Sequence, residues 1–190
     1  VASLSVRFLS FRREVIMADT KRSDAIGVAV QMEKEGIEFY RKAAGQSRNP
    51  LGRRMFESLA ADERRHVEIF QALAAREGVR PAAAEELDRE GPLKRMSAIF
   101  RDAAANIKEV LTADSDDIKA IDVAKGMEEK AFAFYAEAAR GCASPVEKRI
   151  LLKIAAEENE HYRILDDTRL YLTYPEMWFI KEEKPVIDGG

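Results

Sequence analysis

Two stretches of the chain, Ala60-Ala-Asp-Glu-Arg-Arg-His66 and Ala155-Ala-Glu-Glu-Asn-Glu-His161, are similar and lie 95 residues apart. Each contains a Glu-x-x-His unit, and together they hold the two histidines of this 190-residue chain. Side chains three positions apart lie on one face of a helix, so the Glu and His of each unit can bind in one metal region. A single unit arises by chance in a charged helix, whereas two at matching positions predict a metal site.

The similarity extends beyond these units and indicates an internal repeat. Residues 25–69 align with residues 120–164 without a gap, and 17 of the 45 positions are identical. Such self-similarity is typical of a duplicated supersecondary unit. In each copy, apolar residues at helical spacing lead to a capping residue and a proline, Asn49-Pro50 or Ser144-Pro145, and then to a second helical stretch. The pattern predicts helices over about 23–45, 50–76, 117–140 and 145–171.

The two predicted hairpins are joined by a long connection, residues 79–116, which includes a helical stretch over 93–111. Long connections of this kind occur in ferritin-like bundles. We therefore predict an all-α protein, a ferritin-like antiparallel four-helix bundle made of two repeated helical hairpins with a long crossover. The expected organisation is an N-terminal extension, the bundle, and a C-terminal tail that packs over it: residues 1–21, 22–174 and 175–190.

The two helices without histidine supply one glutamate each. Glu33 and Glu128 occupy equivalent positions of the repeat and lie among apolar residues. Four carboxylates nearly neutralise two divalent ions, and imidazole suits iron. One Glu from each of two helices, with one Glu-x-x-His from each of the others, is the ligand set of ferritin-like di-iron or di-manganese bundles. The candidate metal ligands are Glu33, Glu63, His66, Glu128, Glu158 and His161.

A tyrosine follows each isolated glutamate by seven residues, two helical turns further on the same face. The hydroxyls of Tyr40 and Tyr135 can bond a ligand carboxylate or a bound oxygen species, which makes these tyrosines candidate catalytic residues. The alternative is a core tyrosine with a satisfied hydroxyl. Asp62 and Glu157, which precede the Glu-x-x-His units, are either supports for the histidines or solvated surface acids.

These motifs resemble the rubrerythrin branch of the ferritin-like superfamily. The resemblance rests on Met32-Glu33-x6-Tyr40, on Met127-Glu128-x6-Tyr135 and on the two Glu-x-x-His stretches, and it covers residues of about 22–172. It implies that Glu63 and Glu158 bridge two iron ions, with the other four ligands terminal. It also implies reduction of hydrogen peroxide or dioxygen with electrons from a rubredoxin-type donor, while related branches oxidise ferrous iron.

The sequence departs from rubrerythrins in two respects. It contains one cysteine, Cys142, and so has no Cys-x-x-Cys pairs of a fused rubredoxin domain; electrons would come from a separate donor in trans. Rubrerythrins also carry an extra glutamate one turn after the third-helix ligand. That position is Ala131 here, and its repeat partner is Gly36. The small residues either leave room for a ligand beside the metals or allow tight helix packing.

Composition excludes several classes of protein. Hydrophobic residues make up 46% of the chain and charged residues 34%, with a net charge of −3, so we expect a soluble globular protein with no nucleic-acid partner. No apolar run reaches the ~18 residues of a membrane span. We expect a cytoplasmic protein. Met17 is the favoured start of translation, with residues 1–16 an upstream extension; the alternative is that these Arg- and Ser-rich residues are a transit peptide. A homodimer is compatible with the sequence, which does not decide the oligomeric state.

Three functions remain open on the sequence alone. The leading one is a non-haem di-iron oxidoreductase acting on peroxide or dioxygen. The second is the binding and oxidation of ferrous iron without peroxidase turnover. The third is a helical interaction module, metal-stabilised or metal-free, which the cost of burying four unpaired carboxylates disfavours. Manganese is an alternative to iron in each metal-dependent case, because the ligand types do not separate these two ions.

Overall fold

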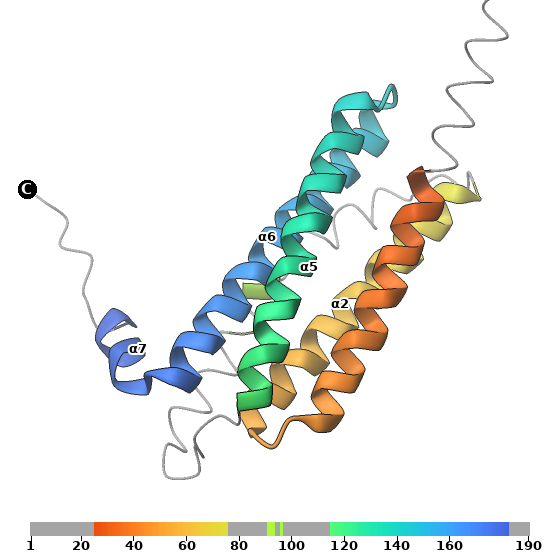
Figure 1. Cartoon of the computed structure of the whole chain (residues 1–190). Helices are drawn as coiled ribbons and strands as arrows, with labels where there is room; N and C mark the ends of the chain where they lie inside the picture. The colour runs from red at the N-terminus through yellow and green to blue at the C-terminus, as the bar shows by residue number, and fades with distance from the viewer. Residues whose placement is uncertain (1–24, 76–90, 94–95, 97–114, 183–190) are drawn as a thin grey trace, which may run out of the picture.

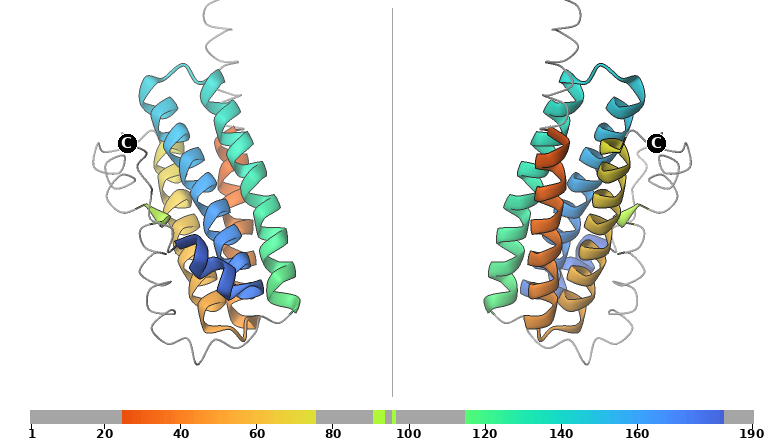
Figure 2. Two further views of the ribbon diagram at one scale, coloured as in Figure 1. Left: turned by 90° about the vertical axis from the view of Figure 1, so that its left-hand side faces the viewer. Right: turned by 90° about the vertical axis from the view of Figure 1, so that its right-hand side faces the viewer.

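The computed structural model describes residues 25–75, 91–93, 96 and 115–182. Four long helices lie side by side: one over residues 25–46, then α2 (Pro50–Ala74), α5 (Ser115–Gly141) and α6 (Pro145–Thr173). They form two antiparallel hairpins whose tight loops lie at opposite ends of the bundle, as Figures 1 and 2 show. The predicted all-α four-helix bundle of two hairpins is confirmed.

The second helix of each hairpin begins as predicted. The Asn49 side chain accepts hydrogen bonds from the backbone N–H groups of Leu51 and Gly52, at 2.9 and 3.2 Å. The Ser144 hydroxyl accepts a longer one, 3.4 Å, from the N–H of Glu147. A proline follows each cap, where its missing N–H costs nothing. The C-terminal bounds shift by two residues: α2 ends before the expected position 76 and α6 continues past the expected position 171.

The apolar core is divided into two clusters by a layer of polar side chains. On α2, one cluster takes residues 51–60 and the other takes Ile69, Phe70 and Leu73. On α6 the order is reversed, because the helix runs the opposite way: Ile150 and Ile154 belong to the second cluster, and the residues beyond position 163 to the first. Both Glu-x-x-His units therefore lie at the same level of the bundle, between two apolar layers.

The chain after the bundle continues into a short helix, α7 (Pro175–Glu182). Trp178 is 7% exposed, and its ring packs edge-on against Tyr171 of α6 with centroids 5.3 Å apart. This part of the tail covers the bundle, as expected. The predicted N-terminal extension, nearly all of the crossover and the last residues lie outside the described part of the chain. None of the helices within that part has the length and apolar character needed to cross a membrane.

Candidate metal centre

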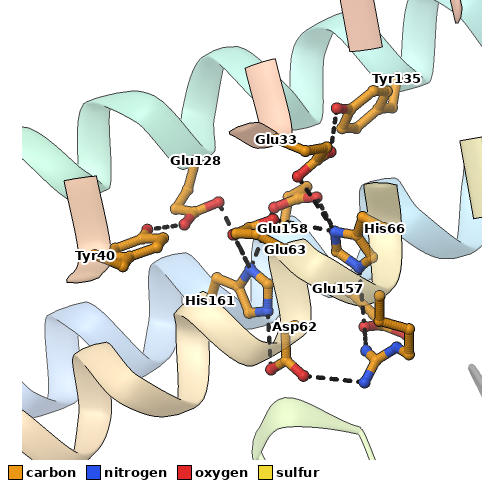
Figure 3. A network of polar contacts seen from close by, with 11 residues as sticks. Glu33, Tyr40, Asp62, Glu63, His66, Glu128, Tyr135, Glu157, Glu158 and His161 are labelled. Carbon is orange, nitrogen blue, oxygen red and sulfur yellow. Dashed lines mark hydrogen bonds and ion pairs between the residues drawn. The ribbon is translucent and has the colours of Figure 1, made fainter. Parts of the chain in front are cut away.

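The six predicted metal ligands meet in the polar layer of the bundle, where each is at most 4% exposed. They form two overlapping groups, in each of which four ligand atoms lie within 4.8 Å of one another. One group contains Glu33 and His66, the other contains Glu128 and His161, and both contain Glu63 and Glu158. Figure 3 shows these two shared carboxylates between the histidines. The arrangement offers two metal positions with Glu63 and Glu158 placed to bridge them.

The distances around each imidazole test whether a metal pair fits this site. His66 Nδ1 lies 3.1 Å from a Glu158 oxygen, 3.2 Å from Glu63 and 3.5 Å from Glu33. His161 Nδ1 faces three glutamates in the same way, at 3.2–3.7 Å. One ring nitrogen can donate a single hydrogen bond, whereas a cation accepts all of these donor atoms together. The donor set therefore fits two divalent ions.

Two further buried acids lie behind the histidines. Glu157 Oε2 is 3.3 Å from His66 Nε2, and Asp62 Oδ2 is 3.4 Å from His161 Nε2. Each acid thus comes from the opposite half of the repeat to the histidine it contacts. A carboxylate on the second ring nitrogen fixes the tautomer and orientation of a metal-binding histidine. Of the two roles open for these acids, the support of the histidines is the one that matches the geometry.

The two tyrosines also reach across the repeat (Figure 3). The Tyr40 hydroxyl donates to Glu128, and the Tyr135 hydroxyl donates to Glu33. Both tyrosines are at most 1% exposed. Each ring stacks on a phenylalanine of α2, Phe56 or Phe70, with centroids 6.1 and 5.3 Å apart. The hydroxyls therefore point at ligand carboxylates, each in the half of the repeat opposite to the tyrosine.

Burial and neighbouring charge separate the carboxylates by acidity in the metal-free protein. Burial, together with the charge of Glu63, raises the pKa of Glu33 from 4.5 to about 7. Burial and the charge of Glu158 raise the pKa of Glu128 well above its usual value. Burial acts in the same sense on Glu158, but the charge of His66 and hydrogen bonds from both histidines prevail and lower its pKa to about 2. A cation that binds here must therefore displace protons from the terminal carboxylates.

A cavity of about 260 Å³ opens over the carboxylates, between the first helix and α5. Both tyrosines and both terminal glutamates line it, as do Gly36 and Ala131. Gly36 also lies close to one of the two shared carboxylates, because a Cβ added there would be 3.3 Å from Glu63 Cγ. Both interpretations of the small residues, close packing and open space, therefore apply. Gly36 allows the Glu63 side chain to approach the first helix closely, and Gly36 and Ala131 together leave open space above the carboxylates.

Sequence reasoning missed Arg65, whose guanidinium contacts both acids behind the histidines. Its Nη1 lies 3.0 Å from Asp62 Oδ1, and its Nη2 donates to Glu157. In the sequence it is one of two adjacent arginines on a charged helix, which is typical of a solvated surface. The repeat alignment contains one signal that could have identified it. Arg65 aligns with Glu160, so the charge at this position is reversed between two otherwise similar stretches.

The fold and the site together define a ferritin-like helical bundle with a buried cluster of carboxylates and histidines whose donor atoms can hold metal ions. The family model for rubrerythrin matches residues 24–168 and, in a second overlapping match, residues 3–74. The chain belongs to the rubrerythrin family, as the sequence motifs predicted. Comparison with curated proteins and with solved structures gave no significant match.

Proposed function

We propose that this protein is a non-haem di-iron oxidoreductase that reduces hydrogen peroxide or dioxygen with electrons from a separate, rubredoxin-type donor. The observation that carries the proposal is the pair of overlapping ligand groups that share Glu63 and Glu158. A shared carboxylate pair holds two ions close enough to act on one small molecule. Membership of the rubrerythrin family supports the same assignment.

The residues of the site have distinct roles in this proposal. Two bound irons supply two reducing equivalents, the number that reduction of peroxide to two waters consumes. The cavity between the first helix and α5 admits the oxidant to the side of the site where Tyr40 and Tyr135 lie. Their hydroxyls hold Glu128 and Glu33 in place and are the nearest proton donors to those carboxylates. The apolar layers above and below exclude bulk water.

A second function, the oxidation of ferrous iron without peroxidase turnover, is supported by a different observation. The resemblance to rubrerythrins implies an extra glutamate at position 131, and alanine occupies that position here. Fewer carboxylates around the cavity favour release of the oxidised ion over repeated turnover at a retained pair. Manganese fits the same donor atoms and remains an alternative metal.

The first experiment measures metal per chain by mass spectrometry, as purified and after anaerobic loading with ferrous iron. Close to two irons per chain, lost in a His66→Ala/His161→Ala variant, would support the proposed centre. The loaded protein is then mixed with peroxide and a chemical reductant. Repeated peroxide consumption with iron retained supports the oxidoreductase, whereas a single oxidation followed by iron release supports iron handling. Absence of stoichiometric metal in both preparations would overturn both functions.

A further inference from the structure

Arg65 stands behind the metal centre at the interface of α2 and α6. Its side chain is 28% exposed, whereas those of Asp62 and Glu157 are 3% and 7% exposed. Two carboxylates buried this deeply repel each other and have lost their hydration. A cation placed between them offsets both costs. Arginine suits that position because its planar fork can donate to two acids at once. One guanidinium therefore joins α2 to α6 through the two acids that support the histidines.

The contacts form a continuous path from Arg65 to both ligand imidazoles. On one side, Arg65 Nη2 and His66 Nε2 share the same oxygen of Glu157. On the other side, Arg65 Nη1 contacts Asp62 Oδ1, while His161 Nε2 lies 3.4 Å from the second oxygen, Oδ2. Each acid is thus held between a guanidinium and an imidazole. A shift of the guanidinium would move both acids and, through them, both rings.

The repeat provides a comparison within the same molecule. The position equivalent to Arg65 in α6 is Glu160, and its carboxylate accepts a hydrogen bond of 3.3 Å from the N–H of Leu93. That glutamate anchors a part of the crossover and contacts neither acid in the described structure. Among the residues that the structure describes, Arg65 thus contacts both supporting acids, whereas its equivalent in the other half of the repeat contacts neither.

We propose that Arg65 is a positioning residue that clamps Asp62 and Glu157 against the two histidines and thereby sets the affinity of the whole metal pair. The inference rests on the proposed dinuclear centre and adds to it a residue that binds no metal. Because one side chain supports both ends of the site, its loss weakens both metal-binding steps together. Loss of a support for a single histidine would weaken one step.

The test is a titration of metal-free protein with Mn²⁺ alone. Calorimetry measures the heat of binding, and electron paramagnetic resonance measures the free Mn²⁺ that remains. We expect Arg65→Gln to lower the affinity of both steps by about 10–100-fold, the usual effect of losing a group that supports a metal-binding histidine. Arg65→Lys restores part of the affinity, because a point charge satisfies one acid and not both. The matched control is Arg64→Gln, which removes the same charge from the exposed neighbouring position.

A double-mutant cycle separates positioning from general stabilisation. In an Asp62→Asn/Glu157→Gln background both side chains are neutral amides that need no neighbouring cation. Arg65→Gln should therefore change Mn²⁺ affinity little in this background. Wild-type affinity in Arg65→Gln would overturn the clamp, as would an equal loss in the Arg64→Gln control or an undiminished loss in the neutral background. If the wild-type protein itself binds no Mn²⁺, the dinuclear centre fails and the clamp fails with it. If the wild-type protein binds two Mn²⁺ and Arg65→Gln binds them with unchanged affinity, the dinuclear centre stands and only the role of Arg65 is overturned.

Discussion

The hydroxyl of Tyr40, on the first helix, donates a hydrogen bond to the carboxylate of Glu128 on α5, 88 positions further along the chain. Tyr135 and Glu33 make the reciprocal bond. Each half of the repeat therefore orients a candidate metal ligand of the other half. This exchange ties the two hairpins together at the level of the metal centre and makes the ligand geometry depend on their docking.

Removing either hydroxyl should disturb the metal centre without unfolding the bundle. In Tyr40→Phe the buried Glu128 loses its donor, and we expect the free energy of unfolding of the metal-free protein to fall by about 1–3 kcal/mol. Metal affinity should fall as well, because the carboxylate is no longer held toward the ions. Urea unfolding and Mn²⁺ titration measure the two effects. Tyr171→Phe, at a buried tyrosine of the core near Trp178, should leave Mn²⁺ affinity unchanged; an equal loss there would contradict the assigned role.

The stability of the metal-free protein should fall as pH rises from about 4.5 to 7. Across this window Glu33 keeps its proton in the folded state, where its pKa is about 7, and loses it in the unfolded chain, where it is near 4.5. The folded state then binds more protons, so stability decreases with pH, by roughly 3 kcal/mol for this group. The raised pKa of both histidines adds loss in the same direction above pH 6.5.

Metal should reverse this dependence. Divalent ions bind the deprotonated carboxylates, so their affinity rises with pH over the same window. Thermal unfolding at several pH values, with and without saturating Mn²⁺, checks both trends. A metal-free protein that becomes more stable between pH 5 and 7 would refute the expected protonation of the terminal glutamates.

The sequence predicted the hairpins and the six clustered residues because these depend on local information. Helical periodicity, the Asn49-Pro50 and Ser144-Pro145 starts and the Glu-x-x-His spacing each act within one helix or loop. The contacts between the halves are different, because they depend on how the hairpins dock. The tyrosines follow Glu33 and Glu128 in sequence, and only the packed bundle pairs each with the glutamate of the other hairpin.

Arg65 shows the same limit more clearly. Arg64 and Arg65 are indistinguishable by residue type, and a shift of one position on the helix decides which of them meets Glu157 of α6. The cavity is also a property of docking, because its lining comes from the first helix, α2, α5 and α6. From the sequence, the small residues at positions 36 and 131 indicated either open space or close packing. In the structure both positions line the cavity, and position 36 also lies close to the Glu63 side chain.

The shared carboxylates should differ from the terminal ones in metal stoichiometry. Glu63 belongs to both ligand groups, whereas Glu33 belongs to one. We therefore expect Glu63→Ala to lose both metals and Glu33→Ala to keep one. Metal content after anaerobic loading with ferrous iron and gel filtration measures this difference. Two irons per chain in Glu63→Ala would refute its bridging role.

Filling the cavity should slow the reaction with peroxide while leaving the metals in place. Ala131→Leu adds a branched side chain to the cavity wall, beside the route to the carboxylates. We expect several-fold slower oxidation of the ferrous-loaded protein in stopped-flow mixing with peroxide, at unchanged iron content. Ala133→Leu makes the same change on the exposed face of α5 and should react at the wild-type rate. Equal rates in the two variants would show that oxidant reaches the site by another route.

Two helical glycines provide a matched test of the close approach to Glu63. Alanine favours a helix interior over glycine by about 0.5–1 kcal/mol. Gly126 has no atom within 4 Å of an added Cβ, so Gly126→Ala should raise the free energy of unfolding by that amount and leave metal binding unchanged. In Gly36→Ala the new Cβ would be 3.3 Å from Glu63 Cγ, so the bridging side chain must move by a few tenths of an ångström. We expect Gly36→Ala to weaken Mn²⁺ binding despite the same helix propensity; wild-type affinity there would mean that Glu63 adjusts freely.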